Sequence, residues 1–203
     1  MITALLQRGT TDDVQYAAQL GRSLLHAQAH DPELADGRLR ASYEPHPFVT
    51  KDTTPYVGSP SVYTGNMAWA GMAFTRLYRA TLNPSYCRAI DWAATTIKAT
   101  DGVYTGVSFY RNDTKKVWFE GTGHLLVAYH ARANGTDPVE ANKLLTTLET
   151  AQTSAPNTDG SGIVAASGDS LDTGQGDYYY AALHTGATAW YVIAAQGGNP
   201  FRL

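Results

Sequence analysis

The sequence predicts an all-α protein whose helices alternate between an inner and an outer layer. Three segments share one layout, a Thr-Gly pair followed by an apolar helical stretch and a closing Asn-Pro or Asp-Pro pair, and they begin at Thr64, Thr122 and Thr185. Amphipathic helices are expected between them, at residues 85–100 and 139–153. Because very apolar helices belong inside and amphipathic ones have an exposed face, this alternation predicts two layers.

The remaining segments follow from capping and turn signals. A first helix is expected over about Thr11–Ala29, ended by Asp31-Pro32, and each repeat helix should begin with its threonine as N-cap and stop at its proline. A weakly alternating segment predicts a short β-hairpin turning at residues 111–113. Residues 31–63 and 154–180 are long loops, which are often functional.

Composition narrows the class of protein. A chain of 203 residues suits a single domain, and a net charge of −3 without a long basic cluster gives no support for a nucleic-acid partner. The lone Cys87 is expected to face the core and excludes both an internal disulfide and a two-cysteine zinc site. No signal peptide or membrane span is recognisable, which predicts a soluble protein, cytoplasmic or secreted after removal of a signal.

Polar and aromatic residues stand directly before the three repeat helices. If these helices run parallel, their N-termini lie on one rim and form a single funnel-shaped site. The residues that would converge there include Tyr63, Trp118, Phe119, Glu120, Asp177, Tyr178, Tyr179 and His184.

These inner segments, GNMAWAGMAFTRLYRAT, VWFEGTGHLLVAY and HTGATAWYVIAAQGGNPF, resemble the (α/α) toroids of six-hairpin glycosidases and related polysaccharide-processing enzymes. The resemblance covers about residues 11–201. It implies a carbohydrate substrate bound in a cleft at the N-terminal ends of the inner helices, with acidic residues that cleave the glycosidic bond and no cofactor. A full toroid has twelve helices, whereas six are predicted here. The chain would be about half a barrel, either a compact relative or one half of a homodimer, and the homodimer is favoured because an open half-toroid exposes apolar helix flanks.

Glu120 is the first candidate catalyst. Its position before a helix, beside aromatic residues, suits a general acid, and the same position also suits an ordinary carboxylate that stabilises the helix N-terminus. Glycoside hydrolysis ordinarily uses a second carboxylate, for which Asp177 and then Asp52 are the candidates, although a loop aspartate often only forms a turn.

Several other side chains are candidates for binding substrate. His124 and His184 could bind a sugar hydroxyl, act as a base or simply be partly buried, and His26 and His30 have metal-ligand spacing but no third ligand, so no metal is predicted. Trp69 and Trp190, at matching depths in their helices, are interpreted as core. The substrate-binding candidates are Tyr63, Asn66, Trp118, His124, Tyr178, Tyr179 and His184.

Three functions remain open. A glycoside hydrolase would use Glu120 and an aspartate. A polysaccharide lyase would use a tyrosine or histidine, such as Tyr63, His124 or His184, to remove the proton beside a uronic carboxylate, with Asn66 as a further candidate. The third is a carbohydrate-binding half-toroid without turnover. New reducing ends, an unsaturated uronide, or neither product distinguish the three.

Overall fold

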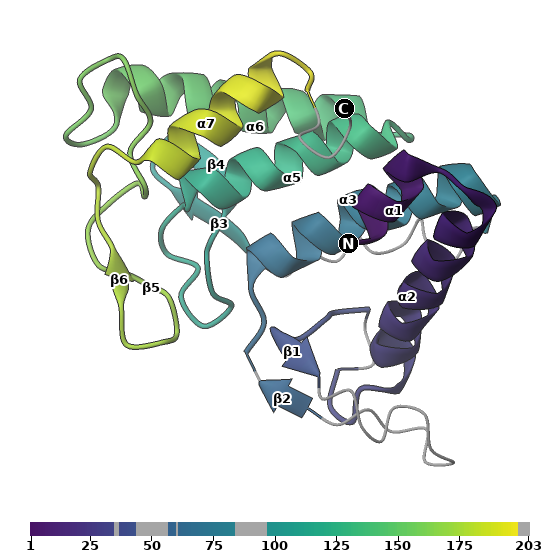
Figure 1. The fold of residues 1–203 in the computed structure, drawn as a ribbon. Coiled ribbons are helices and arrows are strands. Elements are labelled where there is room, and N and C mark those ends of the chain that lie inside the picture. Colours follow the sequence, from purple (N-terminus) through teal and green to yellow (C-terminus); the bar gives the residue numbers. More distant parts are fainter. Residues whose placement is uncertain (35–36, 44–56, 60, 84–96, 199–203) are drawn as a thin grey trace.

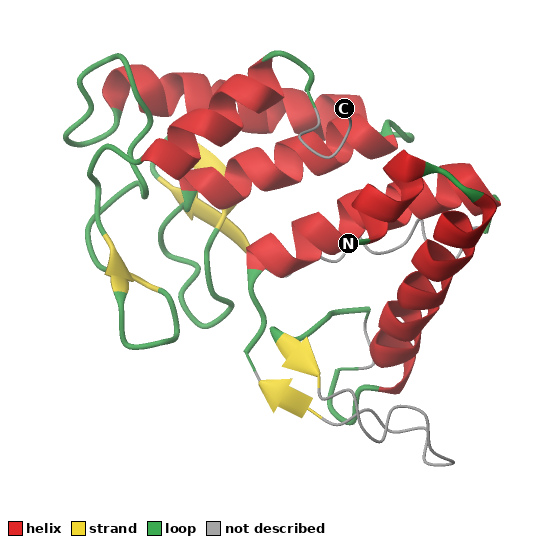
Figure 2. Cartoon of the chain, in the orientation of Figure 1, coloured by secondary structure: helices red, strands yellow, loops and turns green. Residues whose placement is uncertain are grey.

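The computed structural model describes residues 1–34, 37–43, 57–59, 61–83 and 97–198. These residues form six helices and three pairs of short antiparallel strands, which confirms a mainly helical fold (Figures 1 and 2). The helices are α1 (Ile2–Arg8), α2 (Thr11–His30), α3 (Thr64–Thr81), α5 (Phe119–Arg132), α6 (Asp137–Ser154) and α7 (Thr185–Ala195). The strand pairs are β1 (Ser42–Tyr43) with β2 (Val57–Ser59), β3 (Lys98–Asp101) with β4 (Tyr104–Val107), and β5 (Leu171–Asp172) with β6 (Tyr178–Tyr179).

Helix α5 is the centre of the packing. It contacts α3, α6 and α7, and every residue from Gly121 to Tyr129 is buried. A helix that is buried on all sides is expected to be largely apolar, and LLVA in its middle has no polar residue. Helices α1 and α2 pack on α3, at the other end of the layer (Figure 1).

Helix α6 is an outer helix, as its sequence predicts. Its buried residues Ala141, Leu144, Leu148 and Ala151 recur at helical spacing, while Lys143 lies on the exposed face. The expected range of 139–153 is confirmed within two residues at the start and one at the end.

The helix expected at residues 85–100 falls mostly outside the described residues, together with Cys87. Its last part is wrong, because residues 98–100 belong to β3. Strands β3 and β4 form a hairpin closed at Gly102, whose φ of 58° is easily adopted by glycine. The hairpin expected around residues 111–113 forms only in part. The ladder of β4 is with β3, while Tyr110 and Asp113 form an isolated antiparallel bridge and Trp118 N donates to Val107 O at 2.8 Å.

The repeat threonines are not N-caps, so that prediction is wrong. Thr64 and Thr185 are the first helical residues, and Thr122 lies in the first turn of α5. The N-cap positions are taken by Tyr63, Trp118 and His184.

The threonine hydroxyls instead form hydrogen bonds that tie helices to adjacent segments. Thr64 donates to Ser108 O, and Thr122 donates to Trp118 O at 2.9 Å while accepting from Val107 N at 3.3 Å. The polar side chain at this position therefore anchors the start of the helix to the strand segment beside it.

In the second copy of the repeat, the proline does not end its helix as expected. Pro138 lies at the beginning of α6, where its missing N–H costs nothing, and α5 already ends at Arg132 with Ala133 in the left-handed conformation. Helix α7 ends at Ala195, just before Gly197.

Two helix–helix corners have the same construction. At the α1–α2 corner, Arg8 forms a two-point ion pair with Asp13, five residues later, and at the α5–α6 corner Arg132 does the same with Asp137. Each arginine ends one helix and each aspartate lies in the first turn of the next. The corresponding sequences are QRGTTDD (residues 7–13) and ARANGTD (residues 131–137), which have arginine and aspartate at the same two positions.

The fold begins with a helix that the sequence analysis did not predict. Helix α1 is short, and the left-handed Gly9 ends it before the capping box of α2. Among the helices of the described residues, none combines the length and the apolar character needed to cross a bilayer.

Candidate functional site

The N-terminal ends of α3, α5 and α7 lie at one end of the molecule. The three helices run in the same direction, with α5 between the other two (Figure 1). Residues 163–167 connect the segments that precede α5 and α7, because Phe119 N donates to Ala165 O at 3.0 Å and His184 N donates to Ile163 O at 2.9 Å. The side chains at these helix starts are therefore held in fixed relation to one another.

The glycines of two of the three Thr-Gly pairs make close approach between helices possible. A Cβ on Gly186 would lie 2.8 Å from Glu120 Oε1, and a Cβ on Gly123 would lie 3.0 Å from the Cβ of a tryptophan in α7. The third glycine, Gly65, faces His124 Nδ1 at a more relaxed 3.7 Å. The repeated glycine thus has a steric role at the site.

Glu120 lies in the first turn of α5, with its carboxyl group between two histidines. Oε1 is 3.8 Å from His124 Nε2, Oε2 is 3.7 Å from His184 Nδ1, and the side chain is 19% exposed. Burial raises the pKa of the Glu120 carboxyl, while charge on His184 lowers it. A carboxyl group that keeps its proton to higher pH than an exposed glutamate is suited to donate that proton.

His184 is the N-cap of α7. Its Nδ1 accepts a hydrogen bond from Ala187 N at 3.1 Å, so in the neutral ring the proton lies on Nε2. The same Nδ1 faces Glu120 Oε2. Because two acceptors without a proton between them repel each other, a neutral His184 favours the protonated form of Glu120.

His124 lies one helical turn after Glu120 and is enclosed by three tryptophan rings. The ring centroids of Trp190, Trp118 and Trp69 lie 4.2, 5.6 and 5.8 Å from that of the imidazole. Burial lowers the pKa of His124 to about 3, so the ring is neutral at physiological pH. Within the described part of the chain, neither of its ring nitrogens has a hydrogen-bond partner.

An aromatic wall continues from this cluster toward β6. Tyr179 stacks on Trp118 with a centroid distance of 6.0 Å and meets His184 edge-on at 5.5 Å. Burial, and then the charge of Glu120, raise the pKa of the Tyr179 hydroxyl. Tyr63 is buried behind the wall, where its hydroxyl accepts a hydrogen bond from a glutamine side chain at 2.8 Å.

Two other predicted site residues are exposed on the β5–β6 hairpin. Asp177 is exposed in the turn between β5 and β6, where its carbonyl accepts hydrogen bonds from Thr173. Tyr178 is 51% exposed, and because strand side chains alternate, it points away from the face that carries Tyr179. Asp52 is outside the described residues.

Trp69 and Trp190 are the residues that the sequence analysis misjudged. Trp69 is 49% exposed, so its interpretation as core is wrong, and Trp190 is only partly buried. Their rings meet at a centroid distance of 6.3 Å beside His124. Their equal spacing from the Thr-Gly pairs, on neighbouring parallel helices, was the signal that could have placed them at the site.

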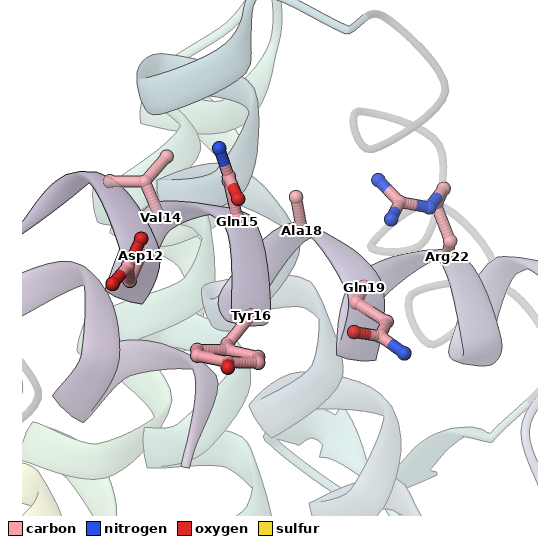
Figure 3. Close-up of a pocket in the computed structure, with 7 residues that line it drawn as sticks. All are labelled: Asp12, Val14, Gln15, Tyr16, Ala18, Gln19 and Arg22. Carbon is pink, nitrogen blue, oxygen red and sulfur yellow. The ribbon is translucent and has the colours of Figure 1, made fainter.

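Two further concavities flank the helices. A groove of about 790 Å³ runs between α1, α2, α3 and β1, and Asn66 and Trp69 line it. A second hollow, of about 410 Å³, is formed by side chains of α2 alone, among them Tyr16 and Arg22 (Figure 3). Only the first reaches a residue of the cluster around His124.

The described residues contain no group of three or more His, Cys, Asp or Glu side chains placed to hold a metal ion. His26 and His30 stack on each other along α2, with centroids 4.2 Å apart. Comparison of the chain with models of known protein families and with curated proteins finds no match.

Proposed function

We propose that the protein is a glycoside hydrolase in which Glu120 is the general acid. The observation that supports this most is the partly buried Glu120 carboxyl, whose pKa is raised by burial, at a rim walled by Trp118 and Tyr179. Aromatic faces bind the apolar faces of sugar rings, and an acid with a raised pKa is the group that a glycosidic oxygen needs.

In the proposed reaction, Glu120 gives its proton to the glycosidic oxygen as the bond to the anomeric carbon breaks. Water then supplies the hydroxyl group of the new reducing end. A second carboxylate activates that water or attacks the sugar, and Asp177 and Asp52 stay the candidates. Asp177 is carried by the short β5–β6 hairpin, next to the strand that places Tyr179 beside His184.

We propose further that the helices are half of an (α/α) toroid that is completed by a second copy. Three parallel helices with their N-termini on one side, and α6 outside them, support this architecture. The two corners of identical construction support an origin from repeated helical hairpins.

A polysaccharide lyase is the second candidate, because one contact favours it. Tyr179 and His184 meet edge-on next to Glu120, and a tyrosine paired with a histidine can remove the proton beside a uronic carboxylate. Burial raises the pKa of the Tyr179 hydroxyl and so disfavours its phenolate form. This works against the lyase reaction, because the phenolate is a stronger base than the neutral hydroxyl.

The test is a panel of neutral and uronic polysaccharides incubated with the wild-type protein, Glu120→Gln and Glu149→Gln. Glu149 is an exposed residue of α6 and serves as the matched control. We expect new reducing ends with the wild type and the control, and a loss of roughly 10²- to 10⁴-fold in Glu120→Gln, the usual contribution of a general acid.

Three other results would contradict the proposal. Absorbance of an unsaturated uronide that persists in Glu120→Gln would indicate the lyase. Sugar binding without any product would indicate a binding module. Equal loss in both variants would show that Glu120 has no special role.

A further inference from the structure

His124 is a buried polar side chain at the rim. Its side chain is 5% exposed, and both ring nitrogens are buried without a hydrogen-bond partner among the described residues. A neutral imidazole always carries one N–H, so one buried donor is left unpaired in either tautomer. Buried polar groups are nearly always paired, so an unpaired one needs a physical explanation.

The surroundings of the ring leave few acceptors. The imidazole faces the rings of Trp69, Trp118 and Trp190, and Gly65 lies beside its Nδ1. On the Nε2 side, the carboxylate oxygen Glu120 Oε1 lies at 3.8 Å. A movement of about 1 Å by the glutamate side chain would bring the two atoms to hydrogen-bonding distance.

We propose that His124 is a positioning residue that donates a hydrogen bond from Nε2 to the Glu120 carboxylate formed when the acid loses its proton. The protonated carboxyl turns its hydrogen toward the substrate and leaves Oε1 at its present distance. When the proton departs, Oε1 gains charge and moves onto the waiting N–H. The ring itself stays neutral, and no proton leaves it.

The two histidines act on Glu120 in different ways. Charge on His184, whose Nδ1 accepts a hydrogen bond from Ala187 N, lowers the pKa of the Glu120 carboxyl, whereas His124 would stabilise the conjugate base through a neutral N–H. Tyr179, on β6, is a further titratable group facing the site among the described residues, and burial raises the pKa of its hydroxyl, so it is neutral at physiological pH like an ordinary tyrosine. The catalytic value of this role rests on the proposed function of Glu120, but the hydrogen bond does not depend on it.

Carbon-13 and nitrogen-15 NMR of the full chain tests the hydrogen bond without any substrate. The carboxyl carbon of Glu120 and the ring nitrogens of His124 are followed as pH rises. We expect His124 to be neutral with its proton on Nε2, and the Nε2 signal to move together with the Glu120 titration. A ring protonated on Nδ1, or an Nε2 signal that ignores the Glu120 titration, would overturn the proposal.

Variants provide the second measurement. His124→Phe should raise the midpoint of the Glu120 titration by roughly one pH unit, and His124→Gln, which keeps a donor, should restore part of the shift. His130→Phe is the matched control, because His130 lies later on α5 and also has a buried, unpaired Nδ1. An unchanged midpoint in His124→Phe, or an equal shift in His130→Phe, would refute the hydrogen bond.

Activity separates the two proposals. If the panel detects hydrolysis, the alkaline limb of the pH–kcat profile should move upward with the Glu120 midpoint in His124→Phe, because the acid is active only when protonated. If the Glu120 midpoint shifts in His124→Phe while the alkaline limb of the pH–kcat profile does not move, the hydrogen bond is supported and Glu120 is not the general acid.

Discussion

At the scale of single residues, the Thr-Gly pair shows how a correct pattern can carry a wrong explanation. The pair was interpreted as a helix start because threonine is a good N-cap, whereas the N-caps are Tyr63, Trp118 and His184. In two copies the threonine, Thr64 or Thr122, ties the helix to the segment after or within β4, and in two copies the glycine, Gly123 or Gly186, admits a neighbouring side chain. Neither the hydrogen bond of the threonine nor the close packing at the glycine is a property of the helix alone, so rules that predict helix starts from the local sequence do not predict them.

Gly186→Ala tests the steric role of this glycine at the site. The added Cβ would meet the Glu120 carboxyl at 2.8–2.9 Å, and this carboxyl, the end of a flexible side chain, will swing away. Because a displacement of about 1 Å can cost roughly 10²-fold in rate, we expect a loss of that size in hydrolysis. The melting temperature should change by only a few degrees, since alanine is the better helix former by about 0.5–1 kcal/mol.

Gly65→Ala is the control for this experiment. Its Cβ would make ordinary contacts at 3.7 Å, with His124 and Trp118, and it should leave hydrolysis nearly unchanged. Full activity in Gly186→Ala, or an equal loss in both variants, would show that the glycine does not make room for the acid.

The candidate site was only partly accessible from the sequence. Glu120, His124 and His184 were selected because they stand at helix starts, and the structure brings these three together. The enclosing role of Trp69 and Trp190 was missed, because regular spacing in an apolar helix is the usual mark of core residues. Only the parallel packing of α3, α5 and α7 makes the two side chains neighbours.

At the scale of elements, long helices were predictable and short strands were not. Residues 11–30 and 137–154 have periodic apolar faces over several turns, so their signal is strong. Strands β1, β5 and β6 have two residues each, which is too short to show an alternating pattern in the sequence. The N-terminal residues of β3 read as the end of an amphipathic helix, because four residues carry too little pattern to distinguish the two.

The end of α2 is held to the following segment by a buried ion pair. Asp31 accepts hydrogen bonds from Arg40 at 2.6 and 2.7 Å, from Tyr43, and from the backbone of Glu33 and Leu34. Burial works to raise the pKa of Asp31, but these hydrogen bonds lower it to about 2. One carboxylate thus joins a helix end to strand β1.

Asp31→Asn should therefore change the acid stability of the protein. The folded pKa lies below the ordinary value near 4, so the contribution of Asp31 is complete above about pH 4 and is lost as pH falls toward 2. We expect the variant to be less stable at neutral pH by about 3 kcal/mol, because Arg40 loses its buried partner, and the gap to close at acidic pH. Urea unfolding between pH 2 and 7 measures this gap.

Asp12→Asn provides the comparison, since Asp12 is exposed in the first turn of the same helix. It should lose only a few tenths of a kcal/mol, the size of a helix-dipole contribution at an exposed site. A gap for Asp31→Asn that stays constant down to pH 2 would mean that its carboxylate is not the group that holds β1 to α2.

At the scale of the whole molecule, the open question is what covers the edges of the helical layer. Helix α5 has neighbours on every side, whereas α7, at the edge, exposes Val192 by 46%, and Leu183 just before it is 50% exposed. A closed toroid would cover such an edge with another hairpin. The proposed second copy supplies that hairpin by symmetry.

Sedimentation equilibrium of the wild-type protein and of Val192→Lys and Val139→Lys decides this proposal. We expect the wild type to have twice the chain mass of 21.9 kDa and Val192→Lys to shift toward the monomer, because a lysine at the interface centre loses its hydration. Val139, 58% exposed on the outer helix α6, lies away from the proposed interface, so Val139→Lys should dimerise like the wild type. A wild-type monomer at every concentration, or equal dissociation of both variants, would leave α7 at a free edge and make the rim around Glu120 a site built by one chain alone.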